Sequence, residues 1–325
     1  MRIHLQSKPS ATNFELSPAE WNEAVSRAPD GATGHDVSFG TTPETFASGM
    51  QDAEILVAHA AAIADGIPNA PKLKLVYATS AGLEKLAPYD WLPDGVTLLN
   101  NRGTHAAKAG EYGLMALLLM VNRVPALMTA QRNGAWSPLH GSVMKGKRLV
   151  VVGLGTLGGT TAHHAHHFGM HVTGVRTSPE PHPACHRVVA VSEFDAVLPE
   201  ADYLYLATPL TPATKHLLNR ARIAKLPKGA SVANVGRGAL IEQEALAEAL
   251  DSGHLGGAVL DVFDPEPIPP GHRLWTTQNL MITPHVSADD PATYNARSLD
   301  IFLDNLRAFR DGRALPNRYD TTRGY

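Results

Sequence analysis

The sequence predicts an α/β protein built from two doubly wound parallel-sheet domains. Short β-like runs alternate with helix-like stretches from end to end, which is the pattern of βαβ units. Runs such as residues 150–152 are continuously apolar, as expected of strands covered on both faces. The length of 325 residues corresponds to about two domains.

The predicted strands fall into two groups, one for each sheet. The first group comprises residues 2–5, 36–39, 54–58, 74–78 and 97–99, and the second comprises 149–152, 171–175, 203–206, 231–234, 257–261 and 281–282. A helix over 105–122 would begin the second domain, and a helix over 291–311 would pack back on the first. We therefore expect a flavodoxin-like substrate domain (1–102 and 287–325), a Rossmann domain (103–286) and a cleft between them.

Composition and charge exclude several classes of protein. Hydrophobic residues make up 44% and charged residues 18%, and the net charge of −3 gives no reason to expect nucleic acid or an anionic membrane as partner. The single Cys185 indicates a reducing compartment. The first ten residues do not resemble an export signal, and the longest apolar run, 114–121, is too short to span a bilayer. A cytoplasmic protein is expected.

A glycine-rich turn joins a predicted strand to a predicted helix. Glycines in such a turn let backbone N–H groups approach a phosphate, and the helix N-terminus then faces a dinucleotide pyrophosphate. The residues expected to bind it are Gly153, Gly155, Thr156, Leu157 and Gly158.

The residues after the next strand bear on cofactor choice. NAD-binding folds usually place an acid there for the ribose 2′-hydroxyl, whereas this chain has Arg176, Thr177 and Ser178. An arginine can pair with a 2′-phosphate, and the two hydroxyls can bind it as well. NADP is therefore expected in preference to NAD. The alternative is that Arg176 is a solvated surface cation and the site binds NAD unselectively.

One guanidinium, one carboxylate and one imidazole follow three later strands. Arg237 offers a bidentate fork for a carboxylate, and the lack of a side chain at Gly238 is expected to leave the guanidinium uncrowded. Glu266 lies between two prolines, and His285 follows Pro284. A histidine paired with a glutamate can act as acid or base. Each residue alone could be an ordinary surface or turn residue, but ligands bind at this edge of a parallel sheet.

The chain resembles the D-isomer-specific 2-hydroxyacid dehydrogenase family, in particular its glyoxylate/hydroxypyruvate reductases. The matching segments are 153–158, 208–212, 234–238, 260–263, 266–267 and 283–285. The resemblance implies that Arg237 binds the substrate carboxylate and carbonyl, that His285 carries the proton and that Glu266 orients His285. It also implies a substrate loop and further cofactor contacts. The loop is Ser80, Ala81, Gly82 and Leu83, and the contacts are Thr208, Pro209, Val235 and Asp261, the last of which could accept from the nicotinamide carboxamide.

The expected function is an oxidoreductase that interconverts a 2-oxo acid and a D-2-hydroxy acid by hydride transfer with NADP or NAD, with His285 as acid and base. Two alternatives remain open: a dinucleotide-sensing, corepressor-like binding protein, and a formate- or phosphite-type dehydrogenase. This chain departs from the family at Arg176 and at Gly110, where the usual Val-Ala-Glu is replaced by Ala-Gly-Glu.

Two further features have alternative interpretations. His163 and His167 are four residues apart on a predicted helix and could share a metal, but no cysteine or carboxylate lies near them in the sequence, so no metal site is predicted. The apolar helix over 112–121 corresponds to the dimer interface of the family, to which Trp136 could contribute. A homodimer is expected on that resemblance.

Overall fold

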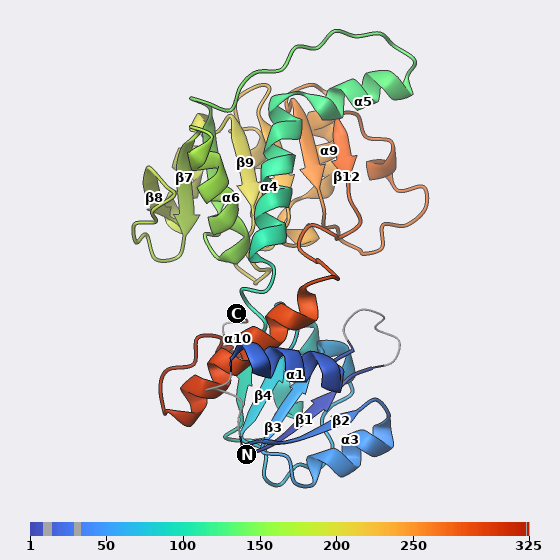
Figure 1. The fold of residues 1–325 in the computed structure, drawn as a ribbon. Helices are drawn as coiled ribbons and strands as arrows, with labels where there is room; N and C mark the ends of the chain where they lie inside the picture. Colours follow the sequence, from blue (N-terminus) through green and yellow to red (C-terminus); the bar gives the residue numbers. More distant parts are fainter. Residues whose placement is uncertain (9–14, 29–33, 323, 325) are drawn as a thin grey trace. The chain divides into compact units, whose positions relative to one another are not determined.

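The computed structural model describes residues 1–8, 15–28, 34–322 and 324. It divides into two compact units (Figure 1): unit 1 comprises Met1–Thr104 and Asp290–Tyr325, and unit 2 comprises His105–Asp289. The chain passes between them after Thr104 and after Asp289. These points lie two and three residues beyond the expected boundaries.

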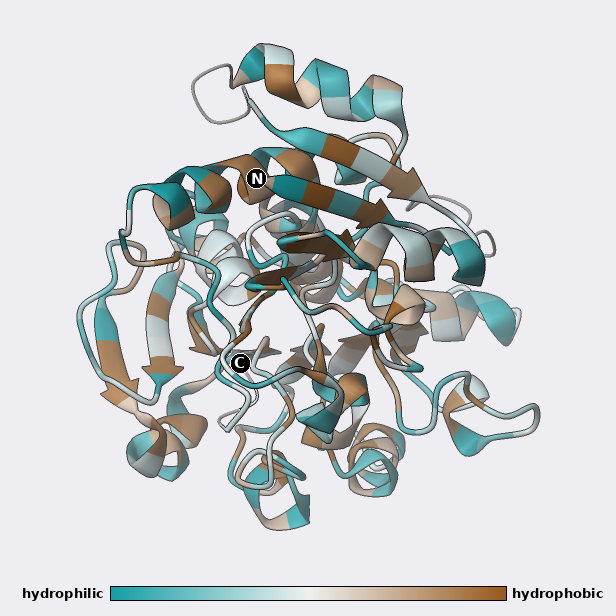
Figure 2. Cartoon of the chain, turned by 90° about the horizontal axis from the view of Figure 1, so that it is seen from below, coloured by the Kyte–Doolittle hydropathy of each residue, from teal (hydrophilic) through white to brown (hydrophobic). Residues whose placement is uncertain are grey.

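Unit 1 contains a five-stranded parallel sheet in the order β2-β1-β3-β4-β5, the flavodoxin-like order. Its strands are β1 (Arg2–Gln6), β2 (Asp36–Gly40), β3 (Ile55–Ala58), β4 (Leu75–Ala78) and β5 (Thr97–Leu99), and its helices are α1 (Pro18–Arg27), α3 (Pro43–Met50) and α10 (Tyr294–Arg310). Every residue of the inner strands β3 and β4 is buried, whereas the edge strand β2 is largely accessible. The continuous apolar runs therefore mark the middle of the sheet, and Figure 2 shows them in brown.

The C-terminal helix α10 belongs to unit 1, as expected from its helical periodicity. Its residues Leu299, Phe302, Leu303 and Leu306 are fully buried in the same core cluster as Trp21 of α1. The helix begins at Tyr294, three residues later than predicted. Asp290 explains the difference, because its carboxylate accepts from the backbone N–H of Ala292 and from the Thr293 hydroxyl and so holds a turn before the helix.

Unit 2 contains a seven-stranded parallel sheet in the order β12-β11-β10-β9-β6-β7-β8. Its strands are β6 (Arg148–Val152), β7 (His171–Arg176), β8 (Arg187–Ala190), β9 (Tyr203–Leu206), β10 (Ser231–Asn234), β11 (Gly257–Leu260) and β12 (Leu280–Ile282). Counted within the unit, this is the Rossmann strand order with one additional strand. The predicted α/β class with two parallel sheets is confirmed.

The helices of unit 2 cover both faces of this sheet. They are α4 (Ala106–Val121), α5 (Val124–Arg132), α6 (Thr156–His167), α7 (Phe194–Val197), α8 (Arg220–Ile223) and α9 (Gln243–Asp251). Helices α4 and α6 pack closely where α4 carries two glycines: a Cβ at Gly113 would overlap Thr161, and one at Gly110 would lie 2.9 Å from Nε2 of His164. The glycine at position 110 therefore accommodates the side chain of His164.

Helix α4 is rich in apolar residues and is followed closely by α5. In the described parts of the chain, no single helix is long and apolar enough to cross a membrane; α4 and α5 satisfy that test only as a pair bent by 65°. Much of α4 is buried in unit 2, including Ala116, Leu117 and Met120. Core packing accounts for these residues.

Candidate functional site

The glycine turn leaves the N-terminus of α6 open to an anion. Gly153 has φ +89°, and a Cβ there would lie 2.7 Å from the carbonyl oxygen of Ala207. A Cβ at Gly158 would overlap the carbonyl oxygen of Gly153, whereas one at Gly155 would meet nothing within 4 Å. Gly155 is the N-cap residue of α6 and has no side chain to accept from the N–H groups of the first turn, in which Thr156 and Leu157 are the first two residues. This turn fits a pyrophosphate.

Arg176 is the last residue of β7, and the exposed Thr177 and Ser178 follow it. Its side chain is 35% exposed and lies 4.0 Å from the carboxylate of Glu180, a long and solvated ion pair. Burial lowers the pKa of His182, and Arg176 and His163 lower it further. Arg176 and these two imidazoles therefore share one region, which is suited to an anionic group.

The turns after β9 and β10 lie backbone against backbone. Thr208 is half-buried and Pro209 is exposed after β9, and Val235 is buried after β10. A Cβ at Gly236 would lie 2.6 Å from the carbonyl oxygen of Thr208. These turns stand at the same carboxyl edge of the sheet as the glycine turn, because all the strands are parallel.

Arg237 is positioned by its neighbours in the chain. Nη1 of Arg237 donates to the carbonyl oxygen of Gly236 at 2.8 Å, and the carbonyl oxygen of Arg237 accepts from Nδ2 of Asn234 at 2.9 Å. Gly238 also has a packing role that was not expected, because a Cβ there would overlap the backbone of Phe263. The glycine thus allows the Arg237 turn to approach the segment that carries Glu266.

Glu266 and His285 form a hydrogen-bonded pair. Oε2 of Glu266 lies 2.9 Å from Nδ1 of His285, and Oε1 of Glu266 accepts from the backbone N–H of Phe263 at 2.8 Å. The imidazole is 49% exposed and the carboxylate 28%. Because the carboxylate accepts at Nδ1, the nitrogen left for a substrate is Nε2.

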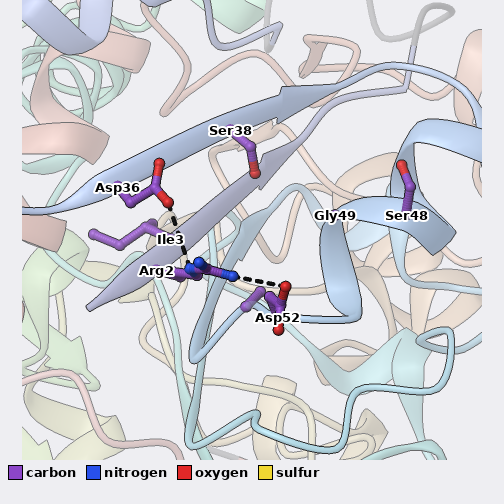
Figure 3. A pocket seen from close by; sticks show the side chains of 8 residues that line it. Arg2, Ile3, Asp36, Ser38, Ser48, Gly49 and Asp52 are labelled. Atoms are coloured by element: carbon purple, nitrogen blue, oxygen red, sulfur yellow. Dashed lines mark ion pairs between the residues drawn. The ribbon is translucent and has the colours of Figure 1, made fainter.

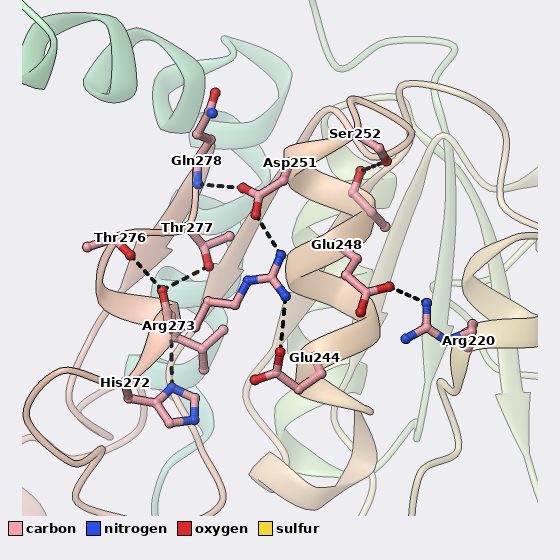
Figure 4. A network of polar contacts seen from close by, with 12 residues as sticks. Arg220, Glu244, Glu248, Asp251, Ser252, His272, Arg273, Thr276, Thr277 and Gln278 are labelled. Carbon is pink, nitrogen blue, oxygen red and sulfur yellow. Dashed lines mark hydrogen bonds and ion pairs between the residues drawn. The ribbon is translucent and has the colours of Figure 1, made fainter.

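The loop that carries Glu266 is fastened to α9. Gln243 accepts from the backbone N–H of Asp264 and donates to its carbonyl oxygen. Farther along, Arg273 pairs with Glu244 at 3.1 Å and with Asp251 at 2.8 Å, and Asp251 also accepts from the N–H of Gln278 (Figure 4). Both ends of the loop are therefore tied to one helix.

His105 is a residue of this region to which the sequence assigned no role. Burial lowers its pKa; Asp289 and the bond to Ala288 act in the opposite direction, and Arg237 and His285 lower it further. Arg237 and His285 therefore both lie near this imidazole. The hydroxyl groups of Tyr112 and Thr283 also form a hydrogen bond in this region, although the two residues are 171 positions apart in the chain.

The predicted substrate loop lies in unit 1 and is described there alone. The hydroxyl of Ser80 accepts from the N–H of Ala60 at 3.1 Å, and Nδ2 of Asn100 donates to the carbonyl oxygen of Ala81 at 2.9 Å. Gly82 is exposed and Leu83 is buried. Neighbouring side chains thus fix the loop and leave its glycine accessible.

A surface hollow in unit 1 and the search for metal ligands add no second candidate site among the described residues. A hollow of about 300 Å³ lies near the amino ends of β1 and β2, where Arg2 pairs with Asp36 and Asp52 (Figure 3). It stands at the edge of the sheet opposite the carboxyl ends of the strands, and its ion pairs are solvated. Among the described residues, no group of three or more histidines, cysteines or acids could hold a metal ion.

Comparison with known proteins gives consistent matches. Residues 114–287 match the family model of the D-isomer specific 2-hydroxyacid dehydrogenase, NAD binding domain. A D-3-phosphoglycerate dehydrogenase of Methanocaldococcus jannaschii is 31% identical over 258 residues, which make up 78% of this chain and 49% of that protein. The chain therefore spans about half the length of that relative.

Two solved structures match along almost the whole chain. A D-isomer specific 2-hydroxyacid dehydrogenase of Xanthobacter autotrophicus Py2, in complex with NADPH and MES, has a TM-score of 0.82 and 28% identity and covers 99% of both chains. An NADPH-dependent glyoxylate/hydroxypyruvate reductase of Sinorhizobium meliloti, in complex with NADP and sulfate, has a TM-score of 0.77 and 26% identity, with 100% of this chain and 99% of that one covered.

Proposed function

The chain belongs to the D-isomer specific 2-hydroxyacid dehydrogenase family, and we propose that it interconverts a 2-oxo acid and a D-2-hydroxy acid with a nicotinamide cofactor. The Glu266–His285 pair carries this proposal, because it leaves Nε2 of an oriented imidazole for proton transfer. Arg237 lies in the same region and supplies a guanidinium for a carboxylate. The two structural relatives described above, which contain NADPH or NADP, support the choice of cofactor.

The residues of unit 2 have distinct roles in this reaction. The open turn at Gly155 would hold the pyrophosphate, and the reduced nicotinamide, when bound, supplies a hydride. Arg237 binds the substrate carboxylate and polarises the neighbouring carbonyl. Protonated His285 gives its Nε2 proton to the carbonyl oxygen and becomes the neutral Nδ1–H tautomer, while Glu266 stabilises the imidazolium before transfer. In oxidation the same nitrogen accepts the proton.

The test is nicotinamide absorbance with NADPH and NADH against glyoxylate, hydroxypyruvate, phenylpyruvate and other 2-oxo acids. We expect turnover, and we expect His285→Ala and Arg237→Ala each to lower kcat/KM by about 10²–10⁴-fold. Variants that stay within about threefold of the parent would show that the reaction uses other groups. Dinucleotide binding without turnover would favour a sensing protein.

We propose NADP as the preferred cofactor, with Arg176 pairing with the 2′-phosphate. The Arg176 guanidinium lies 4.0 Å from the exposed carboxylate of Glu180, a long and solvated pair that a phosphate can replace. Arg176→Ala should raise the KM for NADPH by about tenfold or more, the loss of a charge-assisted pair, and change that for NADH far less. Equal changes for both cofactors would contradict the assignment.

We also propose a cytoplasmic homodimer without nucleic-acid or membrane partners. Five large apolar residues between 115 and 143 are exposed in unit 2: Met115, Leu118, Met128, Trp136 and Val143. Trp136 is 97% exposed, which is costly unless another surface covers it. Light scattering should give the mass of two chains for the parent and of one chain for the double variant Leu118→Asp, Trp136→Ala; an unchanged mass would place the interface elsewhere. Cys185, the single cysteine, fits a reducing compartment.

A further inference from the structure

A chain of hydrogen bonds runs from helix α4 to the buried carboxylate of Asp261. The Tyr112 and Thr283 hydroxyl oxygens are 2.5 Å apart, and the Thr283 hydroxyl donates to Oδ1 of Asp261 at 2.6 Å. A hydroxyl has one hydrogen to donate. Because Thr283 donates to Asp261, Tyr112 must be the donor to Thr283. Burial raises the pKa of Tyr112 to about 12, so its proton stays in place at neutral pH.

The same carboxylate holds the backbone that follows His285. Oδ1 of Asp261 accepts from the N–H of Val286, and Oδ2 accepts from the N–H of Ser287, both at 2.9 Å. Asp261 is fully buried. Three donors therefore converge on it, one from two residues before His285 and two from the residues directly after it. This arrangement goes beyond the expected role of Asp261 as a nicotinamide ligand.

Helix α4 makes a second contact with this segment. Nδ1 of His105 donates to the carbonyl oxygen of Ala288 at 3.1 Å, and the imidazole is only 11% exposed. His105 is the N-cap residue of α4 and Tyr112 lies about two turns farther along, and the residues they contact lie on either side of His285. The segment is thus attached to one helix at both ends and to Asp261 in its middle.

His285 requires such support because its backbone is strained. It has φ +55°, in the left-handed region that a residue with a Cβ seldom adopts. Strain of this kind persists only where surrounding contacts over-determine the conformation.

We propose that Tyr112, Thr283, Asp261 and His105, which we call the α4 clamp, are positioning residues that hold His285 in the orientation used for proton transfer. The inference rests on the proposed function. The clamp acts through the backbone on both sides of His285, whereas Glu266 acts on the imidazole itself.

Thr283→Val tests the clamp with almost no change of volume. It should lower kcat by about tenfold to 10²-fold, the effect expected of a misplaced catalytic group, while the KM values for the 2-oxo acid and NADPH change less than about threefold. Thr283→Ser keeps the hydroxyl and should restore kcat to within about threefold of the parent. Tyr112→Phe leaves the Thr283–Asp261 hydrogen bond intact, so it should lower kcat less than Thr283→Val does.

Thr277→Val is the matched control. Thr277 is also a buried threonine, and its hydroxyl donates to the carbonyl oxygen of Arg273. It has no bond to Asp261 or to the segment around His285, so its removal should leave kcat unchanged.

Amide hydrogen exchange tests the clamp without relying on enzyme activity. In substrate-free protein, Thr283→Val should speed exchange at Val286 and Ser287, because the carboxylate that holds them loses its third donor, while Thr277→Val should not. Parent-like kcat or exchange in Thr283→Val would overturn the clamp, as would equal losses in Thr283→Val and Thr283→Ser. A loss confined to the NADPH KM would assign Asp261 to the cofactor instead. If the parent shows no turnover, or His285→Ala retains it, the proposed function fails, and the exchange comparison still decides whether the clamp exists.

Discussion

Single glycine positions in the candidate site differ in what surrounds them, and the differences separate folding from binding. Gly158 lies against the carbonyl oxygen of Gly153, so its role is the packing of α6 on its own turn. Gly155 faces open space at the N-terminus of α6, so its role concerns whatever approaches that space. A glycine motif in a sequence does not distinguish these two roles, whereas the surroundings of each Cβ do.

A pair of alanine variants tests this distinction. Gly158→Ala should destabilise the protein at the upper end of the roughly 1–3 kcal/mol that overpacking costs, because the obstructing atom belongs to the backbone. Gly155 has an ordinary backbone conformation, and an added Cβ would meet no neighbouring atom, so the Tm of Gly155→Ala without cofactor should match that of the parent. Its NADPH affinity should fall, since a methyl group would occupy the approach to the N–H groups. Calorimetry measures the first effect and titration the second; parent-like NADPH affinity in Gly155→Ala would move the phosphate site elsewhere.

At the scale of helices and strands, the sequence predicted most of the fold. Of the twelve strands in the described part of the chain, all except β8 were predicted, and the ends of each predicted strand lie within one residue of the observed ends. Strand β8 was missed although residues 188–191 are all apolar. It is a four-residue edge strand in which only Val189 is buried, so its apolar run is short and does not continue as a covered strand would.

The residues of the candidate site could be predicted where they belong to short motifs of consecutive residues. Arg237, Glu266 and His285 each stand in a short motif after a strand. His105 and Tyr112 do not, because their importance comes from contacts with residues 183 and 171 positions away. The packing role of Gly238 likewise could not be predicted, because it depends on the close approach of the Phe263 backbone. Contacts between distant segments are a property of tertiary structure and leave no local pattern.

The loop between β11 and β12, which carries Glu266, shows how one helix supports a loop of the candidate site. Arg273→Met removes both ion pairs to α9 and should speed amide exchange in residues 268–276, with a small fall in Tm because the guanidinium is exposed. The difference from the parent should shrink at high salt, which screens exposed charges. Arg220→Met is the control: its partner Glu248 is also on α9, but Arg220 does not contact the loop. If both variants loosen the loop equally, the attachment does not depend on Arg273.

At the scale of the whole molecule, each unit contains a histidine whose burial opposes protonation. In unit 1, His4 is 1% exposed, and its ring nitrogens bond to Ser38 and Gln6. Burial lowers the pKa of His4, and that of His105 in unit 2, below the ordinary value of 6.5. Between 6.5 and the lower folded values, the unfolded chain binds more protons than the folded one. Stability contributed by these residues is therefore complete at pH values well above 6.5 and is lost as the pH falls below it.

The pH range, rather than the sign, separates the histidines from the acids, because both lose their contribution to stability as the pH falls. Lys225 and Arg222 lower the pKa of Asp195, and at Asp202 burial raises the pKa but Arg148 lowers it by more. The contribution of these carboxylates is therefore lost only below about pH 4, where the unfolded carboxylates also take up protons. A decline in stability between pH 7 and 5 therefore reports imidazoles whose pKa is lowered in the folded chain, among them His4 and His105. One fully affected group contributes a slope of at most about 1.4 kcal/mol per pH unit.

His4→Asn tests the contribution of unit 1, because asparagine keeps hydrogen-bonding groups and does not titrate in this range. Urea unfolding at pH 7.5, 6.5 and 5.5, followed by the exchange protection of β1, should show a shallower pH dependence in the variant than in the parent. The comparison uses slopes, so a general loss of stability in the variant does not affect it. Equal slopes would mean that His4 takes up its proton alike in the folded and unfolded chains, and the pH dependence would then have to come from other groups.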